Sequence, residues 1–393
     1  MDRSSALDLL ILGKIAKLWK RNFNRKMKFY EKIIRPILFL LDPETAHIFT
    51  FKMLAIFDRV AFLNKLLASF FNFSDPSLKQ KVFGLNFENP IGLAAGMDKK
   101  ADLTLTWSAF NFGFAECGSI TYQPQPGNAR PRLWRLPQDK AILVHHGLGN
   151  LGAQASAKKL AQAKNRFKRN NILSLSIAKS NEVSMEEAAE DYTKSFQLLA
   201  EYADFITINL SCPNVKNFCG LQNKTLLEPI LIKITNINTH QKPLCLKIGN
   251  DLTKNELDDI IFLVKKYNLA GIIATNSAKD RSRFNFKSKN KDKPGGVSGK
   301  PIAQRANEII AYLYKHSENK FKIIGLGGVF TDTDAYKKIK AGATLVQLAT
   351  GFIYGGPASI KNINQELVKL LQADKLTHIN QAIGLEANNY HLF

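Results

Sequence analysis

The sequence predicts an α/β protein, a (β/α)8 TIM barrel preceded by a small N-terminal helical domain. Two observations predict the barrel. Eight short β-like runs, each ending in small or polar residues, follow one another along the chain, and helical patterns lie between several of them. The main competing architecture is a doubly wound open sheet. It is disfavoured because no GxGxxG motif follows the first run and the order of strand and helix never breaks.

The composition is that of a globular protein with one large core. The chain has 393 residues, of which 45% are hydrophobic and 22% are charged. Its four cysteines, at positions 117, 212, 219 and 245, show no CxxC pair and no zinc or iron–sulfur spacing, so we expect neither a disulfide scaffold nor a metal site. The formal net charge of +22 favours an anionic partner, which is nucleic acid, a membrane surface or a phosphorylated or carboxylated ligand.

The beginning of the chain concentrates positive charge. Residues 9–30 contain seven Lys or Arg residues and no Asp or Glu. The apolar residues of this segment recur with helical spacing, at Leu12, Ile15, Leu18, Trp19 and Phe23. This pattern favours a helix in an anionic membrane interface, and the alternative is a surface helix packed on its own protein. Because no run approaches the ~20 apolar residues that span a bilayer, we expect a peripheral protein. Residues 9–12 are also too short an apolar stretch for a cleavable signal.

A second helical stretch is predicted from about Pro43 to about Phe71. It is rich in Phe, Leu and Ile, contains His47, and with residues 39–41 forms a small apolar helical cap before the main domain. We therefore divide the chain into a membrane-associated extension, residues 1–75, and a barrel domain, residues 76–393, with the barrel itself over roughly residues 80 to 373.

The expected barrel strands and helices follow in order. The strands are 91–94, 114–118, 172–177, 205–210, 244–248, 271–274, 322–325 and 345–348. The helices are 186–203, 255–267, 301–317, 331–341 and 358–373. Thr253 and Glu256 form a capping box that opens the second of these helices.

Glycine-rich turns follow the last two strands. They are Gly325-Leu-Gly-Gly328 and Thr350-Gly351. Backbone without side chains beside helix N-termini lets amide N–H groups converge on phosphate oxygens, and barrels build phosphate sites at these strands. The alternative is a pair of tight turns with no ligand.

The other strand ends are polar, and in a barrel they converge on one rim. They carry Asp98-Lys99, Ser119 and Thr121, Ser176, the segment 209–214, Lys247 and the segment 275–277. Lys247 ends a buried strand, so its ammonium requires an anionic partner or an electron-rich ring. For each residue alone, a structural hydrogen bond is the alternative.

Ordered motifs along the chain carry a resemblance to a known family. They are LDPETAH (41–47), NPIGLAAGMDK (89–99), PQPGNARPRLWRL (124–136), INLSCPN (208–214), LKIGNDL (246–252), IIATNS (272–277), GGVSGKPI (295–302), IIGLGG (323–328) and LVQLATGFIYGGP (345–357). In these motifs the chain resembles the dihydroorotate dehydrogenases, flavin enzymes of pyrimidine synthesis. The helical extension with LDPETAH resembles their membrane-associated, quinone-using class.

The resemblance implies FMN as cofactor and assigns roles to individual residues. FMN would contact Ala95, Gly96, Ser119, Ser176, Asn209, Lys247, Thr275, Gly299, Gly328, Thr350 and Gly351. The substrate would contact Lys99, Asn209, Asn214, Asn276 and Ser277. His47 and Arg135 match residues that line the family's quinone tunnel. In the family's reaction a base removes a proton from C5 of dihydroorotate while C6 delivers hydride to the flavin, which quinone then reoxidises.

The chain departs from the family pattern at several positions of this site. Cys212 stands at the position of the base, where the quinone-using class usually has serine, and a thiol with a reference pKa of about 8.5 needs less help to act as a base. Val144 replaces an asparagine expected on the substrate, a loss that His145 or His146 could make good. Ser176 replaces an asparagine near FMN, and Ala349 replaces a tyrosine.

Three functions follow from these observations. The leading interpretation is a quinone-linked dihydroorotate dehydrogenase on a membrane surface, on the cytoplasmic side of the inner membrane if the organism is bacterial. The second is a divergent flavin oxidoreductase of the same fold with another substrate, motivated by Val144, Leu148 and Ala349. The third is a basic nucleic-acid-binding protein, which ranks last because no RNA- or DNA-binding motif accompanies the charge.

Overall fold

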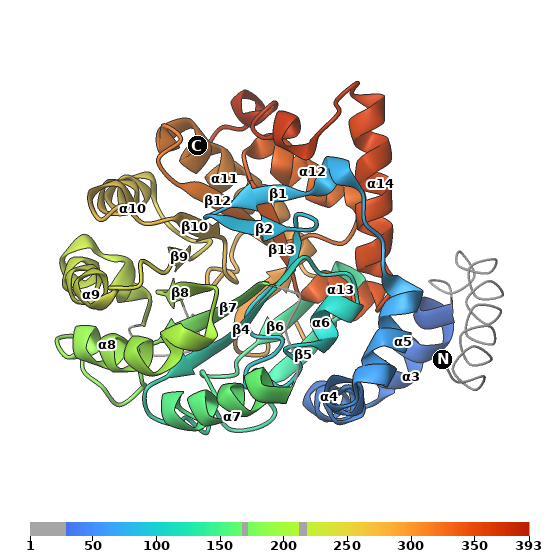
Figure 1. Ribbon diagram of the computed structural model, residues 1–393, viewed down its shortest axis with the longest axis horizontal. Coiled ribbons are helices and arrows are strands. Elements are labelled where there is room, and N and C mark those ends of the chain that lie inside the picture. The colour runs from blue at the N-terminus through green and yellow to red at the C-terminus, as the bar shows by residue number, and fades with distance from the viewer. Residues whose placement is uncertain (1–28, 167–171, 212–217, 393) are drawn as a thin grey trace, which may run out of the picture.

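A closed barrel of eight parallel strands forms the centre of the molecule (Figure 1). The computed structural model describes residues 29–166, 172–211 and 218–392. The hydrogen-bonded order is β10-β12-β13-β3-β4-β7-β8-β9, which is the chain order closed into a ring. The strands are β3 (Ile91–Leu93), β4 (Phe114–Thr121), β7 (Ile172–Ala178), β8 (Phe205–Asn209), β9 (Leu244–Ile248), β10 (Gly271–Ala274), β12 (Lys322–Leu326) and β13 (Leu345–Leu348). The predicted barrel and all eight of its expected strands are confirmed.

Helices surround the barrel (Figure 1). They are α6 (Thr106–Ala109), α7 (Ala153–Arg166), α8 (Ala188–Leu199), α9 (Lys224–Ile237), α10 (Lys254–Lys266), α11 (Ala303–Ser317), α12 (Asp332–Ala341), α13 (Thr350–Gly355) and α14 (Ser359–Ala373). The capping box expected before α10 is present, because Thr253 accepts from the Glu256 amide and the Glu256 carboxylate accepts from the Thr253 amide. Short 3-10 turns are η2 (Pro76–Leu78), η3 (Pro137–Asp139), η4 (Ala200–Tyr202), η5 (Phe218–Gln222), η6 (Lys300–Ile302), η7 (Ile379–Ala382) and η8 (Ala387–Asn389).

The helical cap before the barrel differs from the expected single stretch. It consists of the π-helical turn η1 (Tyr30–Ile34), α3 (Arg35–Leu40), α4 (Pro43–Arg59) and α5 (Ala61–Phe71). Helices α4 and α5 are separate because Val60 is extended, with φ −113° and ψ 105°. Asp58, near the end of α4, accepts hydrogen bonds from the Leu105 and Thr106 amides, which ties the break to the start of α6. The predicted basic helix over residues 9–30 lies almost wholly outside the described residues.

Two small antiparallel sheets were not predicted from the sequence. Strands β1 (Gln80–Val82) and β2 (Leu85–Phe87) form a hairpin, and β11 (Gly296–Gly299), β6 (Ala141–Val144) and β5 (Leu133–Leu136) form a three-stranded sheet. Val82 and Phe87 of the hairpin are buried with Phe114 and Phe205, which lie at the starts of barrel strands. The hairpin therefore closes the amino-terminal end of the barrel, and a ligand must enter from the other end.

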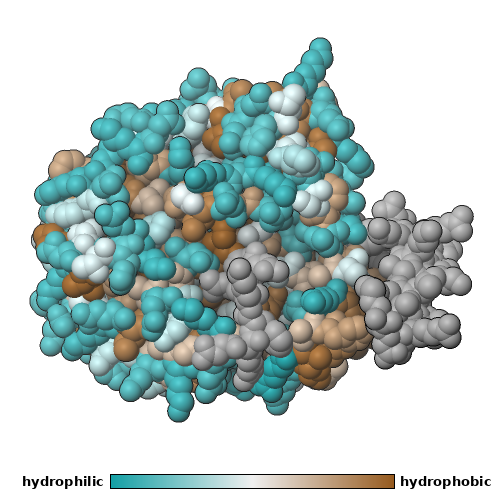
Figure 2. All heavy atoms as spheres, in the orientation of Figure 1, coloured by the Kyte–Doolittle hydropathy of each residue, from teal (hydrophilic) through white to brown (hydrophobic). Residues whose placement is uncertain are grey.

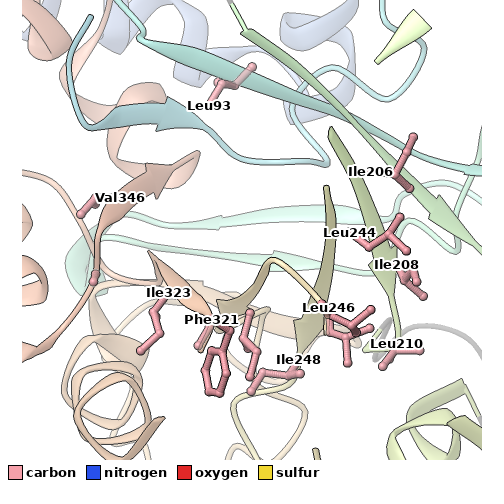
Figure 3. Packing of buried hydrophobic residues seen from close by; sticks show 14 of the residues in the cluster. Leu93, Ile206, Ile208, Leu210, Leu244, Leu246, Ile248, Phe321, Ile323 and Val346 are labelled. Carbon is pink, nitrogen blue, oxygen red and sulfur yellow. The ribbon is translucent and has the colours of Figure 1, made fainter. Parts of the chain in front are cut away.

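The larger part of the core lies between the strands and the surrounding helices. Figure 3 shows Ile206, Leu246 and Ile323 on the barrel strands β8, β9 and β12, and these side chains belong to one buried cluster that includes residues of the helices. Apolar side chains are exposed on the N-terminal helices instead, among them Ile37, Leu40 and Phe49. Figure 2 shows such apolar surface over α4. In the described part of the chain, no helix combines the length and apolar character needed to cross a bilayer.

Candidate active site

One cavity of about 370 Å³ joins the carboxyl ends of the barrel strands to the N-terminal helices. Most of the residues that the sequence singled out line it. They are Ala95, Gly96, Lys99, Ser119, Asn209, Lys247, Thr275, Asn276, Ser277 and Thr350 from the barrel side, and His47 and Arg135 from the helical side. Cys212 and Asn214 lie outside the described residues. The strand ends therefore meet at one rim, as the barrel geometry requires.

Lys247 has the anionic partner that its position demands. Its Nζ lies 3.0 Å from Oε2 of Glu116, and both side chains are almost fully buried, with 3% and 0% exposed. The same oxygen accepts a hydrogen bond of 3.2 Å from the Ala95 amide. The sequence interpretation missed Glu116, although an acidic residue two positions after Phe114 in an otherwise apolar strand is a usable signal.

A chain of hydrogen bonds connects Asn209, Ser119 and Ser176. Asn209 donates to the Ser119 hydroxyl over 2.7 Å, and the Ser119 and Ser176 hydroxyl oxygens are also 2.7 Å apart. Ser119 and Asn209 line the cavity, whereas Ser176 is fully buried and is not part of the lining. Ser176 therefore does not contact the cavity itself but is hydrogen-bonded to Ser119, which does.

The two glycine turns lie against each other. A Cβ at position 351 would be 1.9 Å from the Val329 carbonyl oxygen, so this close approach requires glycine. Gly328 has φ +75° and also packs against backbone, that of Ala303. The cavity lining does not include Gly299, Gly328 or Gly351. Thr350 lines the cavity, and its hydroxyl shares a 2.7 Å hydrogen bond with that of Ser298.

Open space lies beside Gly96. This residue has φ +96°, and a Cβ built on it would meet nothing within 4 Å. The cavity lining contains Lys247 of the buried ion pair, the hydroxyl groups of Ser119, Thr275 and Thr350, and Gly327 of the first glycine turn, which are suited to a flat polar ring with a phosphate. Among residues 29–166, 172–211 and 218–392, no group of His, Cys, Asp or Glu side chains is arranged to hold a metal ion.

Lys99 supplies positive charge at one end of the cavity. It faces the cavity rather than the outer surface, and burial among protein atoms lowers its pKa to about 8, although Glu44 acts in the opposite direction. Asn276 lines the same cavity, and its side-chain amide donates to the Ser211 carbonyl over 2.7 Å. An ammonium and amide groups are suited to a carboxylate and ring amides of a ligand.

The wall near Lys99 also contains the unusual residues of the sequence. Val144 and Leu148 line the cavity, as does His146, whereas His145 does not. The Gly149 amide donates to Nδ1 of His146 over 3.2 Å, which places the proton of the neutral ring on Nε2. Burial, followed by the charge of Lys99, lowers the pKa of His146 to about 2, so the ring is neutral. His146 is thus a neutral hydrogen-bond donor in the wall.

His47 and Arg135 occupy the helical side of the cavity. The ring of His47 packs on Phe51 at 4.1 Å, and burial, reinforced by Lys99, lowers its pKa to about 3. Arg135 donates to the carbonyl oxygens of Leu38, Phe39 and Leu41 at 3.2, 3.2 and 2.7 Å. The guanidinium therefore caps α3 while forming part of the lining.

Comparison with known proteins gives a consistent result. The family model described as dihydroorotate dehydrogenase matches residues 77–371. The chain is 44% identical over 343 residues to a dihydroorotate dehydrogenase (quinone) of Christiangramia forsetii, covering 86% of this chain and 99% of that protein. It is 40% identical over 371 residues to the dihydroorotate dehydrogenase (quinone) of Nostoc punctiforme, covering 92% and 99%. The crystal structure of Eimeria tenella DHODH in complex with ferulenol superposes with a TM-score of 0.81 at 30% identity, covering 89% of this chain and 98% of that chain.

Proposed function

The chain belongs to the dihydroorotate dehydrogenase family, and on that basis we propose that it oxidises dihydroorotate to orotate with FMN as cofactor and a quinone as electron acceptor. One observation carries the proposal. A single cavity contains a lysine and amides suited to an anionic pyrimidine, a second lysine and part of a glycine turn suited to a flavin and its phosphate, and an apolar arm that reaches the N-terminal helices.

The residues of the cavity fit FMN. Ser119, Asn209 and Thr275 offer hydrogen bonds to the ring system, and Lys247 offers positive charge for the reduced ring. Thr350 and the backbone near Gly327 offer hydrogen bonds to the phosphate. When bound, FMN accepts hydride from C6 of the substrate and passes the two electrons to quinone.

The protein groups bind the substrate and move its proton. Lys99 pairs with the carboxylate of dihydroorotate, while Asn276 and Ser277 hold its ring amides. Cys212, as the thiolate, takes the proton from C5 and becomes a thiol, so the substrate loses one proton and one hydride in all. Asn214 joins Asn209 in holding the ring. The assignments of Cys212 and Asn214 rest on their positions in the INLSCPN motif directly after β8.

The quinone reaches the site from the helical side in this proposal. His47, Arg135 and Phe39 line that arm of the cavity. Residues 1–75 act as a membrane-associated extension, and residues 76–393 act as the catalytic barrel. The exposed apolar residues of α3 to α5 and the basic segment 9–30 attach the protein to an anionic surface, which is the cytoplasmic face of the inner membrane in a bacterium.

Anaerobic mixing of the purified protein with dihydroorotate tests the proposal. We expect the flavin absorbance to bleach with dihydroorotate and to return when a soluble quinone is added. A protein that holds FMN but is not bleached by dihydroorotate would favour the second candidate, a divergent flavin oxidoreductase, for which the apolar wall of Val144 and Leu148 is the motivating observation. A protein without bound flavin would refute both.

A further inference from the structure

We propose that Glu116 is a positioning residue that balances the charge of Lys247 and thereby sets the midpoint potential of the bound flavin. This inference rests on the proposed function, because it assumes that FMN occupies the cavity. It concerns a residue that the sequence interpretation did not select.

The Glu116–Lys247 contact crosses the interior of the barrel. Glu116 lies on β4 and Lys247 lies on β9, and strands β7 and β8 separate them in the ring. The 3.0 Å ion pair has 0% and 3% of its two side chains exposed. Two charges at this separation within protein attract each other strongly, since little solvent screens them. The pair therefore forms one unit without net charge.

The carboxylate also connects this unit to the cavity wall. Oε2 accepts hydrogen bonds from both the Lys247 ammonium and the Ala95 amide, so β4, β9 and the segment after β3 meet at one oxygen atom. Ala95 and Lys247 both line the cavity, whereas Glu116 lies behind them. Glu116 thus acts on the cofactor indirectly, through Ala95 and Lys247, which line the cavity.

Only one of the two Glu116 carboxylate oxygens makes a hydrogen bond among the described residues. The other carboxylate oxygen, Oε1, is buried and has no hydrogen-bond partner among the described residues. Cys245, below Lys247 on β9, is also fully buried, and burial together with the charge of Glu116 raises the pKa of its thiol. The charge of this carboxylate therefore affects neighbouring groups inside the barrel. Its ion-pair partner among the described residues is Lys247.

This arrangement has a definite consequence for the flavin. The reduced ring carries more negative charge than the oxidised ring, so net positive charge beside it raises the midpoint potential. With Glu116 in place, the charge of Lys247 is balanced and the potential is held low. Without the carboxylate, a bare ammonium would face the ring and the potential would rise.

The experiment measures the midpoint potential of purified holoenzyme by redox titration against reference dyes at pH 6. An acidic pH is chosen because a buried lysine without a partner loses its proton more readily as the pH rises. We expect Glu116→Gln to bind FMN and to have a more positive potential than the wild type. Glu228→Gln, which removes the same charge from the surface helix α9, is the matched control and should leave the potential unchanged.

Two further variants decide whether Lys247 is the charge that Glu116 balances. Glu116→Gln combined with Lys247→Met again has no net charge, so its potential should fall back toward the wild-type value. At pH 9, where an unpaired buried carboxyl group keeps its charge better than at pH 6, the double variant should also be more positive than Lys247→Met alone. This second comparison does not need soluble holoenzyme of Glu116→Gln alone, because neither of its variants contains an unpaired buried ammonium.

The outcomes separate the inference from the proposed function. An unchanged potential in Glu116→Gln would overturn the inference, as would a double variant as positive as the single one or, at pH 9, equal to Lys247→Met. Each of these results is obtained on protein that holds FMN, so the proposed function would stand. A wild type that binds no FMN would instead end the proposed function.

Discussion

Glu44 of α4 and Arg132, just before β5, form a buried ion pair that attaches the N-terminal helices to the barrel. Arg132 reaches both carboxylate oxygens, with Nη2 2.7 Å from Oε1 and Nε 3.1 Å from Oε2. Its Nη1 donates to the carbonyl oxygens of Pro126 and Asn128 at 2.9 and 3.0 Å. Each side chain is only 9% exposed. The arginine therefore connects helix α4 to the loop that contains Pro126 and Asn128.

Removing one partner of this pair should destabilise the protein. We expect Arg132→Gln to cost about 1.5–3 kcal/mol of unfolding free energy, because the buried Glu44 carboxylate loses its bidentate partner and keeps only the mostly exposed Arg130, whose Nη2 lies 3.0 Å from Oε1. Chemical denaturation measures the loss. Lys369→Met, which breaks an exposed pair with Glu366, should change stability by less than about 1 kcal/mol. Equal effects of the two substitutions would contradict the expectation.

The same pair predicts the direction of a pH effect on stability. Burial alone would raise the pKa of Glu44, but the hydrogen bond and charge of Arg132, together with the charges of Arg130 and Lys99, outweigh burial and lower it. A carboxyl whose pKa is lower in the folded state stabilises the fold above its unfolded value, and this contribution is lost as the pH falls through the folded value. The stability difference between wild type and Glu44→Gln should therefore shrink as the pH is lowered below about 4, near the unfolded pKa of a glutamate.

Lys99 should make ligand binding depend on pH near 8. Its pKa is lowered to about 8, so the ammonium that we propose for the substrate carboxylate is present below this pH and is lost above it. The dissociation constant of the product, orotate, should rise as the pH passes upward through about 8, as followed by flavin absorbance. Lys99→Arg keeps its charge over this range and should abolish the rise. A wild-type constant that stays flat between pH 7 and 9 would refute the role.

Cys212→Ala tests the proposed base. The variant should retain flavin and bind orotate, yet dihydroorotate should reduce its flavin about 10²–10⁴ times more slowly, the usual contribution of a positioned base. Stopped-flow absorbance measures the rate. Cys212→Ser should also slow flavin reduction, because an alcohol loses its own proton less readily than a thiol and needs more help to act as a base. If the alanine variant reduces flavin at the wild-type rate, Cys212 is not the base.

Val144→Asn tests the substrate. If the cavity binds dihydroorotate at a site weakened by valine, the added amide should tighten binding by about 1–3 kcal/mol, or roughly ten- to a hundredfold. His146→Phe removes the neutral donor that stands two residues further along the wall, and it should weaken dihydroorotate binding in the wild-type background more than in Val144→Asn. A wild type inert toward dihydroorotate that Val144→Asn does not rescue would end the dihydroorotate assignment.

The exposed residues of the N-terminal helices should mediate membrane binding. Leu40 is 86% exposed at the end of α3, so Leu40→Asp should weaken binding to anionic vesicles, and deletion of residues 1–28 should weaken it further. Leu385→Asp changes another exposed leucine, which lies near the C-terminus and outside the N-terminal helices. This variant is the control and should have no effect. Quinone turnover should fall in the first two variants while flavin reduction by dihydroorotate is kept. Unchanged vesicle sedimentation in both would refute the attachment.

The sequence by itself determined the barrel and much of the cavity lining. Strand and helix patterns depend on local periodicity, and a closed parallel barrel brings the carboxyl end of every strand to one rim. Lys99, Lys247 and Thr350 could therefore be assigned to one site from the sequence alone. The break at Val60 could not be foreseen in the same way, because the helical pattern continues across it and Asp58 is held by residues of α6.

Only the tertiary structure decided how the charges are paired. The sequence indicated that Lys247 needs a counter-ion, but its partner Glu116 lies 131 positions earlier in the chain. Glu44 and Arg132 are 88 positions apart. The sheet of β5, β6 and β11 likewise joins segments distant in the chain and carries Val144 into the wall. Side-chain type dictates that a buried charge must be compensated, whereas the identity of the compensating group depends on which strands face each other across the barrel.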